Sequence, residues 1–265
     1  MFRTWKRFAP AAAVESAEAL GQLGGSENLE DDIDLCRSQT IEPYFLKYLP
    51  RPGRILEAGS GRGRWVFYLR RRGYDVSGID LARSDVHAAQ AFDPSVPISV
   101  ADVLKVPVPD GHFAAVISLG VVEHFEEGPQ AAFAEVRRVL APGGLFFVTV
   151  PTQNLVRVLV FNHLKSGQLL LKKFRGERLA FEEYRYARPH FATLLREANF
   201  ELLECVPDDF RPPRNMGLYT DIRYLRSPEK KWELNGAGRF VNSALLSVSP
   251  WLHCSGTLWI ARKLR

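Results

Sequence analysis

The chain has 265 residues and a formal net charge of +5, with 46% hydrophobic and 25% charged residues. This composition is that of a soluble globular protein and excludes a disordered chain, a collagen-like fibre and a coiled coil. The length suits one large domain with additions. The apolar runs are far shorter than the roughly 18 residues that a membrane-spanning helix needs, so no transmembrane segment is expected.

Two features indicate a cytoplasmic protein. The opening residues have early positive charge, but their apolar part ends too soon for a signal peptide. The three cysteines, Cys36, Cys205 and Cys254, form no paired or CxxC pattern. Scattered cysteines are typical of a reducing compartment, and they predict neither a disulfide framework nor a structural zinc. We therefore expect no metal site.

The charge is unevenly distributed along the chain. Residues 1–150 carry a net charge of −3, whereas residues 151–265 carry +8, which together make the total of +5. Such a step indicates that the two parts do different jobs. The basic part suits an acidic substrate, a membrane surface or nucleic acid, and a solvated basic surface without a partner is the alternative.

Strands and helices alternate over the middle of the chain. The elements expected in order are a strand at 54–58, a glycine turn at 59–63, a helix at 64–72, strands at 74–80, 98–102, 112–120 and 145–150, and helices at 82–92 and 129–140. This alternation predicts βαβ units and a parallel sheet. The strands are continuous apolar runs, which suits a sheet covered on both faces.

The flanking regions are less regular. Residues 1–40 are interpreted as an arm or lid with a helical patch near 11–23, and residues 41–265 as the main domain. After Pro151 we expect a mixed basic and apolar segment at 154–178, a helix at 189–198, a strand at 200–206, an irregular stretch at 207–255 and a last strand at 256–262. The insertions at about 152–188 and 207–255 are expected to shape the side of a site on which a substrate binds.

The glycine turn Gly59-Ser60-Gly61-Arg62-Gly63 lies between a strand and a helix. Glycines there let the backbone turn tightly and approach a ligand, and the free N–H groups of the helix face that ligand. A P-loop is excluded because no Lys-Ser or Lys-Thr follows. The GxGxG spacing fits a dinucleotide site poorly. An adenosyl ligand without a pyrophosphate is the third alternative.

Acidic residues follow the next two strands. Asp80 ends the second strand, where a carboxylate can accept both hydroxyls of a ribose, although NAD-binding proteins share that acid. Asp102 ends the third strand and suits the amino group of an adenine. Both are expected at the same edge of the sheet, which favours a nucleoside site.

Several motifs in order resemble the class I S-adenosylmethionine-dependent methyltransferases over residues 42–151. They are ILEAGSGRG, GIDLA, ADVLKVPVPDGHF, VVEHFEE and RRVLAPGGLFFVTVP. The resemblance implies a doubly wound, Rossmann-like α/β sandwich with a seven-stranded, mostly parallel sheet whose last strand is antiparallel. Two departures are Ala114-Ala115, where an acid is frequent, and the arginines Arg62 and Arg64 beside the glycine loop.

The resemblance also implies which residues bind the cofactor, S-adenosylmethionine. Asp80 binds the ribose, Asp102 and the backbone of Val103 bind the adenine, and the backbone near Leu119 and Gly120 lies near the methionine amino group. Glu57 orders the loop and takes part in that binding. The implied cofactor-binding set is Glu57, Gly59, Ser60, Gly61, Gly63, Asp80, Leu81, Asp102, Val103, Leu119 and Gly120.

Methyl transfer needs a base only if the acceptor must lose a proton. His124 follows the fourth strand, near where the methyl group is expected, and is either a base or a packing residue. Tyr184 and Tyr186 either line the acceptor pocket or anchor the next helix. His190 is a further pocket candidate or a helix cap.

The segment at 154–178 mixes six Lys and Arg with many aliphatic residues. It is a cover over the acceptor site, a peripheral membrane contact or a solvated cap. Nucleic-acid binding is disfavoured because no RNA-binding module or target-base motif is present. The function expected is methyl transfer to a small molecule at oxygen, the acceptor being anionic or lipid-like. The alternative is a non-catalytic cofactor-binding or scaffold protein on the same fold. The sequence does not set the oligomeric state.

Overall fold

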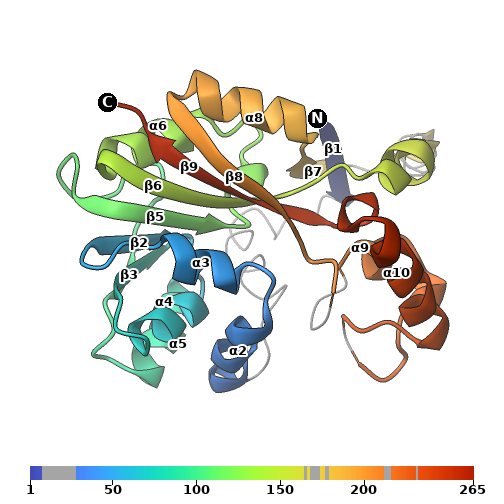
Figure 1. Ribbon diagram of the computed structural model, residues 1–265, viewed down its shortest axis with the longest axis horizontal. Coiled ribbons are helices and arrows are strands. Elements are labelled where there is room, and N and C mark those ends of the chain that lie inside the picture. Colours follow the sequence, from blue (N-terminus) through green and yellow to red (C-terminus); the bar gives the residue numbers. More distant parts are fainter. Residues whose placement is uncertain (8–27, 164–165, 168–173, 177–178, 212–215, 231) are drawn as a thin grey trace.

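The computed structural model describes residues 1–7, 28–163, 166–167, 174–176, 179–211, 216–230 and 232–265. Its centre is a seven-stranded sheet in the order β4-β3-β2-β5-β6-β9-β8 (Figure 1). The strands of this sheet are β2 (Arg54–Ala58), β3 (Asp75–Asp80), β4 (Ile98–Val100), β5 (Phe113–Leu119), β6 (Leu140–Pro151), β8 (Phe200–Asp208) and β9 (Gly256–Lys263). The predicted fold class is confirmed.

Strand direction also follows the prediction. β4, β3, β2, β5 and β6 pair in parallel, and β9 pairs antiparallel with both β6 and β8. β9 is thus the antiparallel strand of the seven. The sheet order reverses at β2, which lies between β3 and β5. In open α/β sheets ligands bind at such a switch point, outside the carboxyl ends of the strands.

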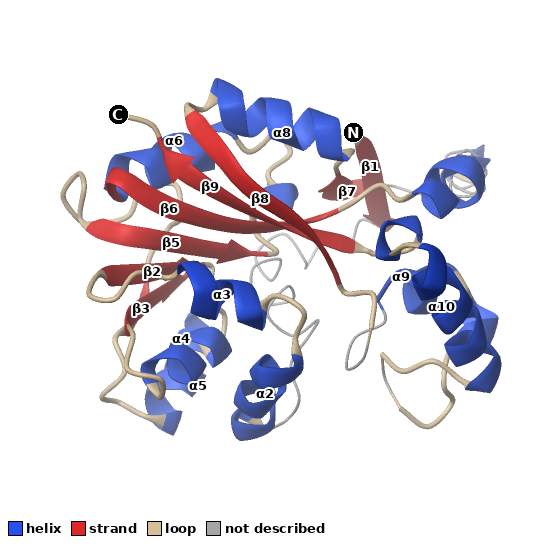
Figure 2. Ribbon diagram, in the orientation of Figure 1, coloured by secondary structure: helices blue, strands red, loops and turns tan. Residues whose placement is uncertain are grey.

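Helices cover both faces of this sheet (Figure 2). One face carries α2 (Leu29–Leu35), α3 (Glu42–Tyr48), α4 (Arg64–Arg70) and α5 (Arg83–Phe92), and the other carries α6 (Gln130–Val139) and α8 (Arg188–Glu197). Because both faces are covered, the central strands are buried along most of their length, as their continuous apolar runs predicted. Each face has its own apolar core, one around Trp65 and Phe45 and the other around Phe133 and Phe191.

A second, two-stranded sheet pairs distant parts of the chain. β1 (Phe2–Arg7) runs antiparallel to β7 (Leu179–Arg185), with a register shift between Arg3 and Trp5. Neither strand was expected from the sequence. β7 contacts the 3-10 helix η2 (Val122–His124), which follows β5. The first residues of the chain are therefore tied, through β7, to the carboxyl end of the central sheet.

The structure corrects the expectation for 207–255, which is not irregular. It holds α9 (Met216–Asp221), η4 (Arg223–Leu225), α10 (Gly236–Val248) and η5 (Pro250–Leu252). The Asn235 side chain caps α10 by accepting a hydrogen bond from the Gly238 N–H. Asn and Gly are residue types typical of loops, but here Asn235 and Gly236 begin a helix.

Part of the arm expected at 1–40 is helical. Glu30, Asp31 and Asp32 lie in the first turn of α2, which Asn28 caps, and acidic residues stabilise a helix at that end. Leu29 and Ile33 are buried in the core that α4 shares. The short helix η1 (Cys36–Ser38) continues α2. The helical patch expected near 11–23 lies outside the described residues.

Within 154–178 the described part is helical at residues 155–163, with a π-helical centre, η3 (Arg157–Phe161). The Asn154 side chain accepts a hydrogen bond from the Arg157 N–H. In the described parts of the chain, no helix has both the length and the apolar character to cross a membrane.

Candidate cofactor and acceptor site

The candidate site lies at the carboxyl ends of β2, β3, β4 and β5. The glycine loop leaves β2 and crosses over β3, because the N–H groups of Gly59 and Ser60 both donate to the Ile79 carbonyl at 2.9 Å. The loop then enters α4 at Gly63. The free N–H groups at the start of α4 therefore lie at the switch point of the sheet.

The three glycines of the loop have positive φ angles of 81°, 53° and 78°, which disfavour any side chain. Their surroundings differ. A Cβ on Gly59 would lie 2.3 Å from Val121 Cγ2, and one on Gly63 would lie 2.3 Å from Ile98 Cδ1. Among the described residues, a Cβ on Gly61 would meet only Asp85 Oδ2, at 3.8 Å. Protein side chains fill the space beside Gly59 and Gly63, whereas the described part of the chain leaves the space beside Gly61 open.

Asp80 lies directly against this open space. Its Oδ2 accepts a hydrogen bond from the Gly61 N–H at 2.7 Å, and its Oδ1 accepts one from the Ala82 N–H at 2.8 Å. The carboxylate thus joins the glycine loop to the start of α5. A carboxylate has about four acceptor positions, so Asp80 retains capacity for ligand hydroxyls.

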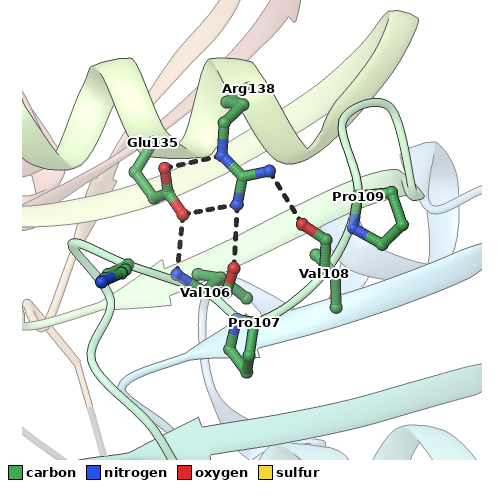
Figure 3. Close-up of a pocket in the computed structure, with 7 residues that line it drawn as sticks. Val106, Pro107, Val108, Pro109, Glu135 and Arg138 are labelled. Carbon is green, nitrogen blue, oxygen red and sulfur yellow. Dashed lines mark hydrogen bonds and ion pairs between the residues drawn. The ribbon is translucent and has the colours of Figure 1, made fainter.

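The segment after β4 is held in place from behind. The Asp102 Oδ1 accepts a hydrogen bond from the Leu104 N–H. Further along, Glu135 accepts one from the Val106 N–H, while Arg138 of the same helix donates to the carbonyls of Val106 and Val108 (Figure 3). This bracing from α6 fixes the position of the loop that carries Asp102.

Three exposed apolar side chains lie next to these acids. Leu81 follows β3, Val100 ends β4, and Leu104 follows Asp102. Val103, by contrast, is buried. Exposed aliphatic groups on neighbouring strand ends give a flat aromatic ring a surface to pack on. The two carboxylates and these exposed apolar side chains together therefore suit a nucleoside.

Glu57 at the end of β2 is buried, and burial raises the pKa of its carboxyl to about 8. The positive charge of Arg64 and a hydrogen bond from the Val66 N–H oppose that rise. Its Oε2 accepts no hydrogen bond from the part of the chain that is described. Glu57 thus contacts the first turn of α4, and one of its buried oxygens has no hydrogen-bond partner among the described residues.

Three other cofactor candidates contact the protein itself. The Ser60 side chain packs on β3, where its Oγ would be 2.8 Å from a Cβ on Gly78. The Gly120 N–H donates to Thr149 Oγ1 at 3.1 Å. Leu119 packs against the core beside α4. At these three positions any cofactor contact would come from remaining backbone groups.

His124 is the last residue of η2, which contacts β7. Its Nδ1 is 2.9 Å from the carbonyl oxygen of Glu182. Because a carbonyl only accepts, Nδ1 must carry the hydrogen, which leaves Nε2 of the neutral ring as an acceptor. The Glu182 carboxylate in turn accepts a hydrogen bond from the Thr4 hydroxyl of β1. The small sheet thus fixes the tautomer and orientation of His124.

The aromatic pocket candidates differ in availability. Tyr184 is buried, its hydroxyl donates to the Glu126 carbonyl at 2.7 Å, and Arg3 lies over its ring. Tyr186 is buried too, but its hydroxyl bonds to no described residue. The exposed His190 ring stacks on Tyr186. Tyr184 therefore anchors β7, whereas Tyr186 and His190 remain acceptor-side candidates.

Glu123 is a functional candidate that sequence reasoning missed. Its carboxyl is buried beside His124, and burial raises its pKa to about 8. Its Oε1 would be 3.7 Å from a Cβ on Gly120, and Tyr186 and Glu183 are its charged or titratable neighbours. The signal in the sequence was an acidic residue in the segment that directly follows a central strand.

Comparisons with known proteins show the family of the chain. The model of a methyltransferase domain family matches residues 34–205, well over half of the chain. The chain belongs to this methyltransferase family. S-adenosylmethionine is the cofactor of the family, and the open cradle at Gly61 and the unpartnered buried Glu57 oxygen fit it. Asp80, Asp102 and the exposed apolar groups are the residues that would hold its adenosyl part.

Individual relatives match shorter stretches of the chain than the family model does. A probable S-adenosylmethionine-dependent methyltransferase of Mycolicibacterium smegmatis is 34% identical over 100 residues, covering 37% of this chain and 38% of the relative. A malonyl-[acyl-carrier protein] O-methyltransferase of Serratia marcescens is 32% identical over 119 residues, covering 44% and 41%. The chain thus spans less than half the length of these relatives.

The fold has close counterparts among solved structures. A methyltransferase of Methanosarcina mazei superposes with a TM-score of 0.58 at 16% identity, covering 84% of this chain and 97% of that one. At this identity the likeness shows the fold alone.

Proposed function

We propose that this protein transfers a methyl group from S-adenosylmethionine to an oxygen of a small-molecule acceptor, and that His124 takes the acceptor proton. The sulfonium cofactor, when bound, supplies an already activated methyl group. The protein then has to align the two reactants, which accounts for much of the rate of such reactions. A hydroxyl acceptor must also lose its proton, and that task falls to a base.

The observation that carries this proposal is the fixed ring of His124. The Glu182 carbonyl holds the hydrogen on Nδ1, so Nε2 presents a lone pair at the carboxyl end of β5. A base held in one tautomer by its second nitrogen is the arrangement that proton-abstracting histidines use. Burial disfavours the anionic form of Glu123, so in its protonated form that neighbour does not compete for the acceptor proton.

The acceptor class follows from charge. The residues after 151 carry most of the basic excess, and Lys172, Lys173 and Arg175 lie among aliphatic residues in the sequence. Of these, Arg175 is exposed, while 172 and 173 lie outside the described residues. An acceptor with an anionic group and an apolar part suits this composition. The Serratia marcescens relative supports oxygen as the methylated atom, since it is named an O-methyltransferase.

The test is a methyl-transfer screen with labelled S-adenosylmethionine and a panel of apolar phenols, carboxylates and amines. We expect transfer to a hydroxylated acceptor that also bears an anion. His124→Asn should lower kcat by about 10²–10⁴-fold while calorimetry shows unchanged cofactor affinity. His87→Asn, an exposed histidine on α5, is the matched control and should leave kcat unchanged. Full activity of His124→Asn, or transfer to amines alone, would overturn the proposal.

A further inference from the structure

Two helices near the site have unusual surfaces. In a helix at the surface of a globular protein, apolar residues face the core and polar residues face water. The helical segment at 155–163 and α10 both depart from this rule. Each is held to the protein by polar or small groups and presents apolar side chains outward.

The segment at 155–163 is fixed through Arg157, which is buried. Its guanidinium pairs with Asp221 of α9 at 2.6 Å and donates to the carbonyls of Thr152 and Ser255. On the side away from Arg157, Leu155 is 53% exposed and Leu159 is 65% exposed. The inward face of this helix is therefore charged, and its outward face is apolar.

The same inversion occurs in α10. Its buried positions are Gly238, which packs against η4, and Asn242, whose Oδ1 is 2.9 Å from His253 Nε2. Opposite them, Phe240 is 76% exposed and Val248 is 75% exposed. Positions 240, 244 and 248 recur every four residues and thus form one apolar stripe.

Both helices lie at the end of the molecule where the parallel strands finish (Figure 1). Arg157 connects them through α9, which precedes η4 and α10. This is also the end at which the candidate site opens. The outward faces of 155–163 and α10 therefore belong to the surface around the site.

The charge of these segments indicates what covers them. Residues 154–178 and 209–248 together contain 13 Lys and Arg against 5 Asp and Glu, whereas the rest of the chain contains 22 against 25. The exposed basic side chains described there are Arg175, Arg211, Arg223, Lys230 and Arg239. A second copy would bring a surface of the same sign, which repels. A negatively charged surface with an apolar interior attracts both kinds of side chain.

We propose that the outward faces of 155–163 and α10 form a surface that docks on a membrane containing anionic lipids. The apolar side chains enter the boundary between headgroups and acyl chains, and the basic side chains contact the headgroups. Docking places the carboxyl ends of the strands, and with them the site, next to the membrane. An acceptor with an apolar part then reaches the site from the lipid, although docking itself requires neither cofactor nor acceptor.

The experiment is co-sedimentation of the full chain, without cofactor, with vesicles of equal parts phosphatidylcholine and phosphatidylglycerol, or of phosphatidylcholine alone. We expect binding to the mixed vesicles that falls as salt rises. Leu155→Ser/Leu159→Ser and Phe240→Ser/Val248→Ser should each weaken it by about tenfold, and Arg223→Gln/Lys230→Gln/Arg239→Gln should weaken it in the mixed vesicles alone.

The control is Leu46→Ser/Leu264→Ser, two exposed leucines outside these helices, which should bind as the wild type does. Circular dichroism confirms that every variant is folded. Absence of wild-type binding, or equal loss in the control, would overturn the proposal. So would light scattering that shows a dimer which Phe240→Ser/Val248→Ser dissociates, because the surface would then join two copies. Failure of methyl transfer leaves vesicle binding unaffected, so the two proposals fail separately.

Discussion

At the scale of single residues, the glycine loop shows that one sequence motif meets two different needs. Gly59 and Gly63 are required because Val121 and Ile98 occupy the space beside them. Gly61 is required by its φ angle of 53° and has open space beside it. The motif alone predicts close approach of a ligand at all three, whereas in the described structure Gly61 is the one of the three with open space beside it.

Gly61→Val is therefore expected to abolish binding of S-adenosylmethionine while the sheet stays folded. The side chain would occupy the ligand's space, and the positive φ angle adds strain of about 1–2 kcal/mol. Gly73→Val is the matched control, because Gly73 also has a positive φ angle and open space but lies in the turn between α4 and β3. Calorimetry should show lost binding in the first variant and wild-type affinity in the second. Normal binding by Gly61→Val would show that the cofactor lies elsewhere.

Glu123 leads to a prediction about pH. Its pKa is about 8 in the folded protein against 4.5 as its ordinary value, so between these pH values the folded state holds a proton that the unfolded state has lost. The free energy of unfolding from this group therefore falls as pH rises from about 4.5 to 8. Glu123→Gln has no carboxyl to titrate and therefore removes that loss. The melting temperature of the variant minus that of the wild type should be larger at pH 8 than at pH 5.

The expected difference is about 2–4 °C for each kcal/mol recovered. Glu127→Gln, an exposed glutamate on the same loop, is the control and should change neither melting temperature. An equal shift of Glu123→Gln at both pH values would mean that its carboxyl titrates normally.

At the level of residues, the place of a side chain could be predicted where it follows from the strand that carries it. Asp80 and Glu57 stand at the ends of apolar strands, so their position at the sheet edge could be predicted. The role of His124 could not be settled, because Glu182, which orients its ring, is distant in sequence and lies on an unpredicted strand. Glu123 was overlooked because burial, and with it a raised pKa, depends on β7 and Tyr186 packing over it.

At the scale of elements, the Arg157–Asp221 ion pair joins the helix at 155–163 to α9. Both side chains are almost fully buried, and Arg185 lies 3.9 Å from Asp221. Removing Arg157 takes away the shorter of these two ion pairs and leaves the buried Asp221 carboxylate with the more distant Arg185. Arg157→Met should therefore destabilise the protein by about 3 kcal/mol, measured by urea unfolding.

The matched control is Arg262→Met, which breaks an exposed pair with Glu201 and should cost less than about 1 kcal/mol. Arg157→Met/Asp221→Leu should recover part of the loss, since no buried charge is then left alone. If Arg157→Met costs no more than Arg262→Met, the pair does not hold the two helices together.

Elements that pack by periodic apolar faces were predicted, and those that pack otherwise were missed. α4, α6 and α8 bury several apolar residues each. α10 buries Gly238 and Asn242, so its pattern resembles a loop. β1 and β7 were missed because their pairing joins the two ends of a span of about 180 residues, which no local pattern records.

At the scale of the whole molecule, the uneven charge predicts how activity depends on salt. If the basic segment attracts an anionic acceptor, salt should weaken that attraction, because the Debye length is about 8 Å at physiological ionic strength. Lys172→Gln/Lys173→Gln/Arg175→Gln should raise the acceptor's KM and flatten the dependence of kcat/KM on salt. The affinity for the cofactor should not change, because the candidate cofactor-binding residues lie within residues 1–150, which carry a net charge of −3.

Steady-state kinetics at low and high salt measure both quantities. Lys105→Gln, an exposed basic residue that lines a pocket with Glu135 and Arg138 outside the basic segment, serves as the control. Wild-type kinetics of the triple variant at low salt would mean that the basic segment does not contact the acceptor.

The place of β9 has a consequence for how the chain is made. β9 pairs with β6 on one side and with the edge strand β8 on the other, so until β9 exists β6 lacks its second neighbour and β8 lacks its neighbour in the sheet. Residues 209–255 must be synthesised before β9, which takes roughly 2–10 s at ordinary ribosomal rates. During that interval the nascent chain carries an unpaired edge on β6 and an unpaired strand, β8, and unpaired strand edges are surfaces that attract other chains. The nascent protein is therefore most dependent on chaperones late in its synthesis, after its cofactor-binding half has already been made.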